Sequence, residues 1–330
     1  MTDHRHDVLG IGNAIVDVLA HADDAFLVRE GLVKGSMTLV DAERSEALYG
    51  RMGPAVQTSG GSAANTIAGV ASLGGRAAYV GKVRDDDLGK VFRHDIGAIG
   101  VDFPTAPATA GAATARCMIM VTPDAQRTMA TYLGACVALG PEDVDDATVA
   151  GAGIVYLEGY LFDPAGGRAA FVKAARIARQ AGRKVALTLS DPFCVDRHRD
   201  AFRVFVRDHV DLLFANEDEI LSLTGAADFD SALQAIRPIV PIAALTRSAK
   251  GSVVVAGAEV HVVDAAPVAH VVDTTGAGDL YAAGFLFGLA RGEPLADCAR
   301  IGAIAAGEVI SHIGPRPERR LAELLPAALR

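Results

Sequence analysis

The residues best suited to chemistry lie at 273–279, which read DTTGAGD. Two glycines and a carboxylate stand there at the expected start of a helix, and glycine lets a ligand approach the backbone closely. Unpaired N–H groups and the helix dipole attract anions at such a point. A carboxylate would repel a bound phosphate, so Asp279 is better suited to act as a general base toward an attacking hydroxyl. The N–H groups of Gly276, Ala277 and Gly278 would then stabilise a transferring phosphoryl group. The alternative is that Asp279 only caps a buried helix.

A second glycine pair, Gly60 and Gly61, opens an expected helix that carries Asn65 one turn further on. Asn13 and Asp17 follow a short apolar strand at 8–12 and could bind a small polar ligand, or only close a turn. The glycines at 10 and 12 resemble a dinucleotide-binding start, but Ile15 takes the place of the third glycine, so we discount that interpretation. The helix after Gly61 could equally be a tightly packed Ala/Gly helix.

From residue 150 onward, strands and helices alternate regularly, which predicts a mostly parallel sheet with helices on both faces. Ligands of such sheets gather at the carboxyl ends of the strands, where Asn13, Asn216, Thr246 and Gly276 fall. We therefore expect a three-layer α/β/α fold formed by one domain, 1–330. The segments at about 14–40 and 105–135 are expected to form a small β-sheet lid. We also expect an extended segment ending at 271–272 and helices at 295–311 and 318–328.

Acidic residues follow the strand that ends near Asn216. Acidic side chains are common at helix starts for dipole reasons alone. Beside a phosphate site, however, Mg²⁺ prefers one or two carboxylates and several waters. Asn216 and Glu219 are therefore candidates for a magnesium site that acts through water, on equal terms with simple helix capping.

Composition narrows the class of protein. The chain has 330 residues, 51% of them hydrophobic, and a net charge of −9 with a pI near 5.5. An acidic chain without Trp does not favour nucleic-acid binding. We see no membrane-spanning apolar run and no signal peptide. The four cysteines form no CxxC motif, which favours free thiols and a cytoplasmic protein.

Together, 60–65 and 273–279 resemble the two signatures of the ribokinase-like (PfkB) sugar and nucleoside kinases, and Asn216 and Glu219 resemble the family's magnesium and phosphate motif. The resemblance runs from Val8 to about Pro317. Within the family, 10–17 and 126–135 are most similar to adenosine kinases. It implies ATP-dependent phosphorylation of a nucleoside 5′-hydroxyl, with adenosine as the leading candidate and Mg²⁺ as the cofactor.

The resemblance also implies roles for individual residues. It assigns Asp279 as the base, Gly276, Ala277 and Gly278 as the anion hole, and Arg127 in the lid as a phosphate ligand. The implied substrate-binding residues are Asn13, Asp17, Gly60, Gly61, Asn65 and Leu161, where Leu161 stands at the place of a base-stacking aromatic. The implied ATP-binding residues are Asn216, Thr246, Lys250, Gly251 and Thr274. Asp273 and Thr275 would hold a monovalent cation such as K⁺.

Three other interpretations remain. A kinase of the same fold could act on a free sugar such as ribose, fructose or a keto-deoxy sugar acid. A dinucleotide-dependent oxidoreductase is disfavoured by Ile15, and a nucleotide sensor without catalysis is disfavoured by Asp279 with Gly276 and Gly278. The expected binding partner is a small nucleoside or sugar, and we expect neither nucleic acid nor a membrane as a partner. The protein is expected to be a monomer or a homodimer.

Overall fold

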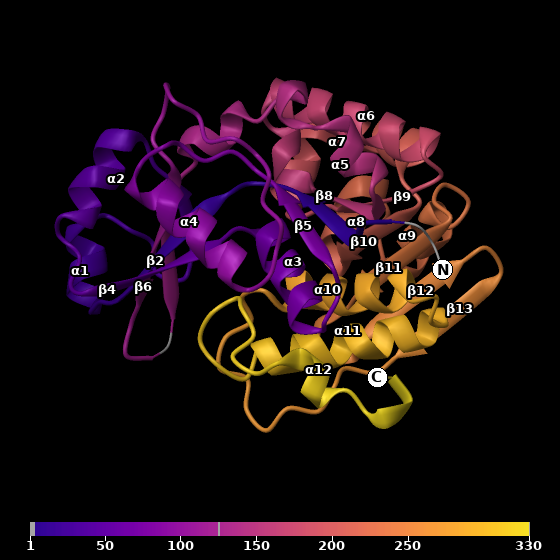
Figure 1. Ribbon diagram of the computed structural model, residues 1–330. Coiled ribbons are helices and arrows are strands. Elements are labelled where there is room, and N and C mark those ends of the chain that lie inside the picture. The colour runs from indigo at the N-terminus through magenta and orange to yellow at the C-terminus, as the bar shows by residue number, and fades with distance from the viewer. Residues whose placement is uncertain (1–3, 125, 330) are drawn as a thin grey trace.

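The computed structural model describes residues 4–124 and 126–329, which form a large sheet with helices on both faces and a smaller second sheet (Figure 1). The large sheet has eight strands in the order β13-β12-β11-β10-β9-β8-β1-β5. Its strands are β1 (His6–Ile11), β5 (Ala77–Val80), β8 (Ala152–Glu158), β9 (Lys184–Thr188), β10 (Leu212–Asn216), β11 (Ile242–Thr246), β12 (Ser252–Ala256) and β13 (Glu259–Val263). All neighbours from β11 to β5 pair in parallel, and β12 and β13 are antiparallel. The expected α/β class is confirmed.

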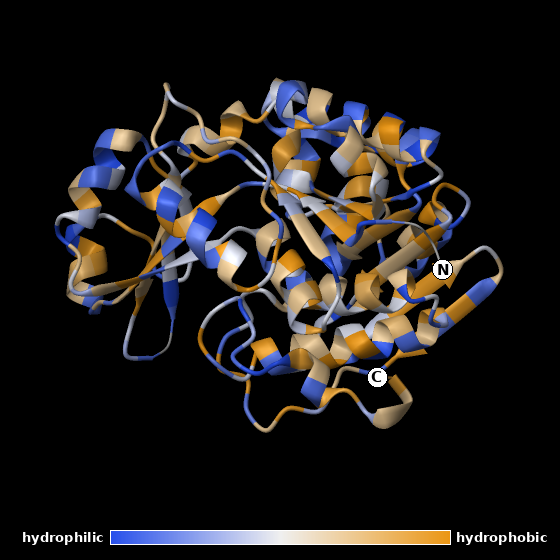
Figure 2. Cartoon of the chain, in the orientation of Figure 1, coloured by the Kyte–Doolittle hydropathy of each residue, from blue (hydrophilic) through white to orange (hydrophobic). Residues whose placement is uncertain are grey.

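Helices cover both faces of this sheet. One face carries α3 (Ser62–Ser72), α10 (Ala277–Ala290) and α11 (Leu295–Val309), and the other carries α5 (Asp146–Ala150), α6 (Ala165–Gln180), α7 (Pro192–His209), α8 (Glu217–Thr224) and α9 (Phe229–Ile236). Apart from the edge strand β13, the strands are mostly buried, as expected for a sheet covered on both sides. Figure 2 shows hydrophobic residues concentrated in these strands, whereas α6 alternates hydrophobic and hydrophilic residues.

The second sheet forms a lid of five strands in the order β3-β7-β6-β2-β4. They are β2 (Ile15–His21), β3 (Met37–Leu39), β4 (Ala55–Gly60), β6 (Ala115–Val121) and β7 (Arg127–Tyr132). The short helices α1 (Asp24–Arg29) and α2 (Ala42–Tyr49) belong to this part of the chain, and α4 (Asp87–Ala98) lies against β2 and β4. The two predicted lid segments supply four of these strands. We missed β4, because it looks locally like a linker before the glycine pair.

Two further expectations about local structure are wrong. No strand is present at 264–276; instead the backbone N–H groups of Val272 and Asp273 donate to the carbonyl of Ile310, at 2.8 and 3.3 Å. The predicted helix at 318–328 is reduced to α12 (Leu321–Leu324) and a short 3₁₀ turn, Ala327–Leu329. Both segments are fixed by tertiary contacts, which override local propensity.

Candidate active site

The start of α10 is shaped by Gly276, which precedes the helix with a φ of +81°. A Cβ at this position would lie 2.8–2.9 Å from atoms of Pro315, so both the backbone angle and the lack of space require glycine. The N–H groups of the first turn, including those of Gly278 and Asp279, have no carbonyl four residues earlier within the helix. The start of α10 therefore offers backbone donors of the kind that an anion site needs, and its binding of an anion stays a prediction.

Asp279 lies in this first turn and faces α3. Its Oδ1 accepts a hydrogen bond of 2.6 Å from the Ser62 hydroxyl, and its Oδ2 accepts one of 3.1 Å from Nδ2 of Asn65. Burial raises the pKa of Asp279, while the two hydrogen bonds and the charge of Arg316 act in the opposite direction. A carboxylate with a raised pKa beside an anion site is suited to accept a proton. Asp279 and Asn65, which come from the two glycine-rich segments, therefore lie in contact.

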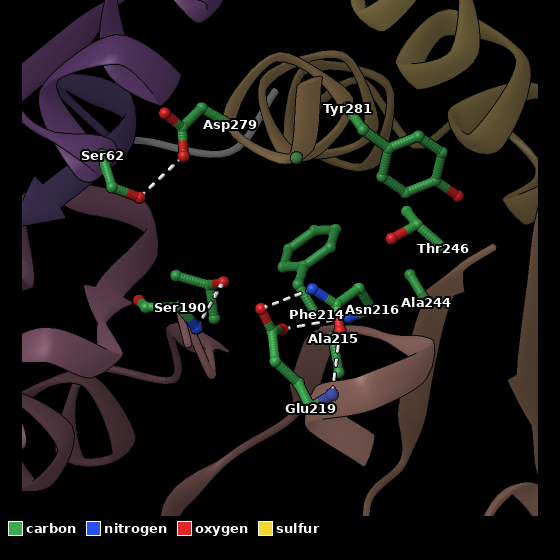
Figure 3. Close-up of a pocket in the computed structure, with 12 residues that line it drawn as sticks. Ser62, Ser190, Phe214, Ala215, Asn216, Glu219, Ala244, Thr246, Asp279 and Tyr281 are labelled. Carbon is green, nitrogen blue, oxygen red and sulfur yellow. Dashed lines mark hydrogen bonds between the residues drawn. The ribbon is translucent and has the colours of Figure 1, made fainter. Parts of the chain in front are cut away.

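A cavity opens on the other side of Asp279 and extends over the ends of β9, β10 and β11 (Figure 3). Its lining residues are Ser62, Thr188, Ser190, Phe214, Ala215, Asn216, Glu219, Ala244, Thr246, Gly278, Asp279 and Tyr281. In Figure 3, Asp279 and Ser62 lie across the cavity from Asn216 and Glu219. The cavity thus joins the predicted base to two of the residues expected at ATP, Asn216 and Thr246, because parallel strands bring their carboxyl ends to one edge.

Asn216 and Glu219 bond to each other at the start of α8. Oδ1 of Asn216 accepts from the backbone N–H of Glu219 at 2.8 Å, and the Glu219 carboxylate accepts from both N–H groups of Asn216, at 2.8 and 3.0 Å. Burial, reinforced by the negative charges of Asp191 and Asp279, raises the pKa of Glu219 to about 7. A nearby cation would relieve this unfavourable charge.

The residues fit Mg²⁺ only as an indirect site. Within 4–124 and 126–329, no group of three or more His, Cys, Asp or Glu side chains could hold a metal ion by itself. Mg²⁺ commonly takes one or two protein carboxylates, with waters and phosphates filling its other positions. Glu219 on the cavity wall meets this requirement.

The residues expected to bind the acceptor sugar meet at the hinge between lid and large sheet. A Cβ on Gly60 would lie 2.2 Å from Oδ2 of Asp17, and one on Gly61 would lie 2.2 Å from the carbonyl of Asn13. Gly61 also has a φ of +98°. The glycine pair therefore lets Asp17 and Asn13 approach the start of α3. Burial raises the pKa of Asp17 to about 7, against the effect of the positive charges of Arg316 and Arg127.

Glu158 is a buried acidic residue at this hinge that sequence reasoning did not assign to the site. Its Oε1 accepts from the backbone N–H and from Nδ2 of Asn13, at 3.2 and 2.7 Å, and its Oε2 accepts from the N–H of Ala63 at 2.8 Å. Burial outweighs these three donors and raises the pKa of Glu158 to about 7. The sequence feature that could have indicated Glu158 is its position as a single charged residue at the end of the otherwise apolar strand β8.

Arg127 connects the lid to the loop that precedes α10. Its Nη2 lies 2.8 Å from Oδ2 of Asp273, and both side chains are more than nine-tenths buried. Asp273 also accepts from the N–H and hydroxyl of Thr275, at 3.0 and 2.8 Å, and from the N–H of Gly314 at 3.1 Å. The Asp273 carboxylate thus accepts three hydrogen bonds and also lies beside the positive charge of Arg127. These groups do not fit a monovalent cation at Asp273 and Thr275 while Arg127 is paired with Asp273.

Four residues expected at the site do not line this cavity. The Leu161 side chain is fully buried in the core beneath the α5–α8 layer. Its neighbour Tyr160 is only partly buried, and burial together with the charges of Asp191 and Glu158 raises its pKa. The residues Lys250, Gly251 and Thr274 lie outside the cavity lining.

Three further residues at the site were missed. Ser62 bonds to Asp279, Ser190 lines the cavity with a left-handed φ of +67°, and Arg316 bonds to Asn65. A positive φ is uncommon for serine and often marks functional positions. Ser62 stands within the glycine-rich signature, but no local pattern pointed to Ser190 or Arg316.

The family follows from a direct comparison. Residues 33–320 match the model of the pfkB family of carbohydrate kinases. The chain belongs to this family, as its two glycine-rich segments indicated.

Among solved structures, the chain is 56% identical to the adenosine kinase from Sinorhizobium meliloti, with a TM-score of 0.90 over 97% of this chain and 98% of that one. It is 53% identical to a probable sugar kinase from Rhizobium etli CFN 42, with a TM-score of 0.91 over 97% of both chains. The adenosine kinase of Saccharomyces cerevisiae is 27% identical over 92% of this chain and 95% of its own length. Guanosine-inosine kinase of Escherichia coli K12 is 29% identical over 67% of this chain. The match covers only about half, 53%, of the length of that protein.

Proposed function

We propose that this protein transfers the γ-phosphoryl group of ATP to the 5′-hydroxyl of a nucleoside, with adenosine as the leading acceptor and AMP as the product. The observation that carries the proposal is the position of Asp279. Its carboxylate is held by Ser62 and Asn65 at the mouth of α10, on the wall of the cavity that reaches Asn216 and Thr246. Similarity to the Sinorhizobium meliloti adenosine kinase supports the choice of acceptor.

In the proposed reaction, the acceptor sugar lies between Asp17, Asn65 and the backbone of Gly61. Asp279 takes the proton of the primary hydroxyl as its oxygen attacks the γ-phosphorus. The bond from that phosphorus to the bridging oxygen of ADP breaks, and ADP leaves with the bonding electrons. The N–H groups at Gly276, Ala277 and Gly278 stabilise the charge that develops on the phosphoryl oxygens.

The remaining predicted residues have supporting roles in this proposal. Glu219 and Asn216 would hold Mg²⁺ through water, and the ion would supply positive charge beside the phosphates. Arg127 exchanges Asp273 for a phosphate oxygen during transfer. Lys250, Gly251 and Thr274 border the outer part of ATP. Asp273 and Thr275 accept a monovalent cation only where Arg127 has moved away.

The setting follows from the same proposal. Cys117, Cys136, Cys194 and Cys298 are all buried free thiols, which is typical of a reducing compartment such as the cytoplasm. Residues for the acceptor and for the phosphates come from one chain, so we propose activity as a monomer or a homodimer. No described helix is long and apolar enough to span a membrane.

A free sugar is the second candidate acceptor. Leu161 is buried and cannot stack on a base, and the probable sugar kinase from Rhizobium etli is 53% identical to this chain. Purified protein, ATP and Mg²⁺ should be tested with a panel of nucleosides and free sugars, with ADP release as the readout. Turnover of adenosine above all other acceptors supports the proposal, whereas turnover of free sugars alone replaces it with the second candidate.

A further inference from the structure

Arg316 belongs to the loop that follows α11, and this loop is firmly held. The N–H of Gly314 donates to Asp273 at 3.1 Å, and Oε1 of Glu308 accepts from the N–H groups of Glu318 and Arg319, at 3.1 and 2.9 Å. Glu308 itself is buried. The backbone on both sides of Arg316 is therefore anchored, which gives its side chain a defined place beside the predicted base.

A chain of two hydrogen bonds joins Arg316 to that base. Nε of Arg316 donates to Oδ1 of Asn65 at 2.9 Å, and Nδ2 of Asn65 donates to Oδ2 of Asp279 at 3.1 Å. An amide oxygen only accepts and an amide nitrogen only donates. Because guanidinium groups have no acceptor, Arg316 fixes the amide in the orientation that presents its NH₂ to Asp279. Without Arg316, the amide could rotate and place its oxygen against the carboxylate.

The other end of the guanidinium has an unused donor. Nη2 of Arg316 is buried and has no hydrogen-bond partner among the residues at 4–124 and 126–329. A buried unpaired donor is costly, and it calls for an acceptor that the folded chain does not provide. Arg316 also lines a cavity of about 340 Å³ between the lid and the loop, together with Leu19, Thr58 and Pro315.

The chemistry of the missing acceptor follows from the neighbouring charge. Asp17 is buried in β2 opposite Thr58, which lines this cavity together with Arg316, and no ion pair within 4.0 Å joins Asp17 to Arg316 among the described residues. A hydroxyl can donate to a carboxylate and accept from a guanidinium at the same time. A sugar hydroxyl between Asp17 and Arg316 would satisfy both groups.

We propose that Arg316 is a positioning residue for Asp279, acting through Asn65, and that its Nη2 selects acceptors by donating to a secondary hydroxyl of their sugar. The second role rests on the proposed function. The first concerns the geometry of Asp279 and can be tested without turnover.

The charges around Asp279 determine how the test is interpreted. The positive charge of Arg316 lowers the pKa of Asp279, whereas burial raises it. Acidic and phenolic groups also face it from the lid, the large sheet and α8: Asp17, Tyr156, Glu158, Tyr160 and Glu219. Of these groups, Asp17 also loses the charge of Arg316 in a variant, so its carboxyl resonance is followed in the same titration. With the ionisation of Asp17 known at each pH, the remaining change in the pKa of Asp279 reports the loss of this guanidinium and of the orientation it gives Asn65.

The first experiment measures that pKa directly. In protein labelled with ¹³C at aspartate carboxyl groups, the Asp279 resonance is identified by its absence in Asp279→Asn and titrated in wild type and in Arg316→Gln. The expected result is a higher pKa in Arg316→Gln and an unchanged pKa in Arg319→Gln, whose arginine is exposed in the same loop. Equal pKa values in wild type and Arg316→Gln would overturn the positioning role.

The second experiment tests selection of the acceptor. Wild type should prefer the full ribosyl acceptor over its 2′-deoxy and 3′-deoxy forms, and Arg316→Gln should lose about tenfold in kcat/KM for the full acceptor, the scale of one hydrogen bond to a charged group. It should lose much less for the deoxy form that lacks the contacted hydroxyl. Arg316→Lys keeps the charge and should restore the pKa of Asp279 more than the discrimination.

The outcomes separate the two proposals. A wild-type protein that phosphorylates no nucleoside or sugar contradicts the proposed function and the selective role, while the titration still decides the positioning role. Turnover in wild type with equal losses for full and deoxy acceptors in Arg316→Gln contradicts the selective role alone. Lower thermal stability without any change in pKa or discrimination would assign Arg316 a structural part only.

Discussion

At the scale of single residues, the site is built around acids placed away from water. Asp279 is held by two donors, Ser62 and Asn65, and burial raises its pKa. A base must be ionised to accept a proton, so a raised pKa moves the acidic limb of activity toward neutral pH. Because burial raises its pKa, Asp279 is a stronger base than an exposed aspartate would be.

Replacing Asp279 by Asn should remove the base and leave the shape of the site. We expect turnover to fall by about 10²–10⁴-fold, the usual contribution of general base catalysis, while the KM for ATP stays within a few fold. Steady-state kinetics by ADP release provides the measurement. Asp230→Asn, on the exposed side of α9, is the matched control. Undiminished turnover in Asp279→Asn would remove the assigned base.

At the scale of elements, the mouth of α10 depends on the loop packed against it. Gly276 and Gly292 stand at opposite ends of this helix with nearly equal φ angles, +81° and +78°. They differ in their surroundings, because a Cβ at 276 meets Pro315, whereas one at 292 meets nothing within 4 Å. The pair therefore separates backbone strain from crowding.

Gly292→Ala should cost about 1–2 kcal/mol of stability from the left-handed backbone alone. Gly276→Ala should cost more and should also lower turnover, because the helix start must move away from Pro315. Chemical unfolding and steady-state kinetics of both variants check this. Equal losses of stability with unchanged turnover in Gly276→Ala would show that the contact with Pro315 does not shape the anion site.

The lid is joined to the loop before α10 by the ion pair between Arg127 and Asp273, at 2.8 Å. Since Asp273 already accepts three hydrogen bonds and pairs with Arg127, thermal unfolding of the ligand-free protein should be the same in KCl and in choline chloride at equal ionic strength. In Arg127→Ala the carboxylate loses its cationic partner, and K⁺ should then raise the unfolding temperature specifically. Arg84→Ala, which removes a side-chain hydrogen bond to the carbonyl of Gly111 and leaves Asp273 untouched, is the control. Specific stabilisation of wild type by K⁺ would contradict this interpretation of Asp273.

At the scale of the whole molecule, the buried acids couple stability to pH. The pKa values of Asp17, Glu158 and Glu219 are each raised to about 7 by burial, from ordinary values of 3.8, 4.5 and 4.5. The folded protein therefore binds these protons more tightly than the unfolded chain does. Their contribution to stability is present below the unfolded values and is lost as pH rises through the folded ones.

The free energy of unfolding of the ligand-free protein should accordingly decrease between about pH 5 and pH 8. Glu158→Gln removes one of the three groups and should make this decrease smaller, although it weakens the hydrogen bonds to Asn13 and Ala63. Urea unfolding at several pH values measures the slope, and Glu43→Gln on exposed α2 is the control. An unchanged slope in Glu158→Gln would mean that Glu158 stays ionised throughout.

The sequence alone was enough to predict the α/β class, the family and the two glycine-rich segments that carry Asp279 and Asn65. These features are local: helix starts, strand ends and glycines are encoded by neighbouring residues, and parallel strands necessarily bring their carboxyl ends together. By that rule, Asn216 and Thr246 line the same cavity. They are direct partners at the ends of the neighbouring strands β10 and β11.

Only the tertiary structure decided the partners of these residues. Arg316 lies 251 positions from Asn65 in the chain, and Glu158 lies 145 from Asn13. Arg127 of the lid meets Asp273 in the loop before α10, and Leu161 faces the core although its place in the motif suggested the site. Hydrogen bonds between distant side chains and the direction of a side chain in a 3₁₀ turn depend on packing, and no local pattern records packing.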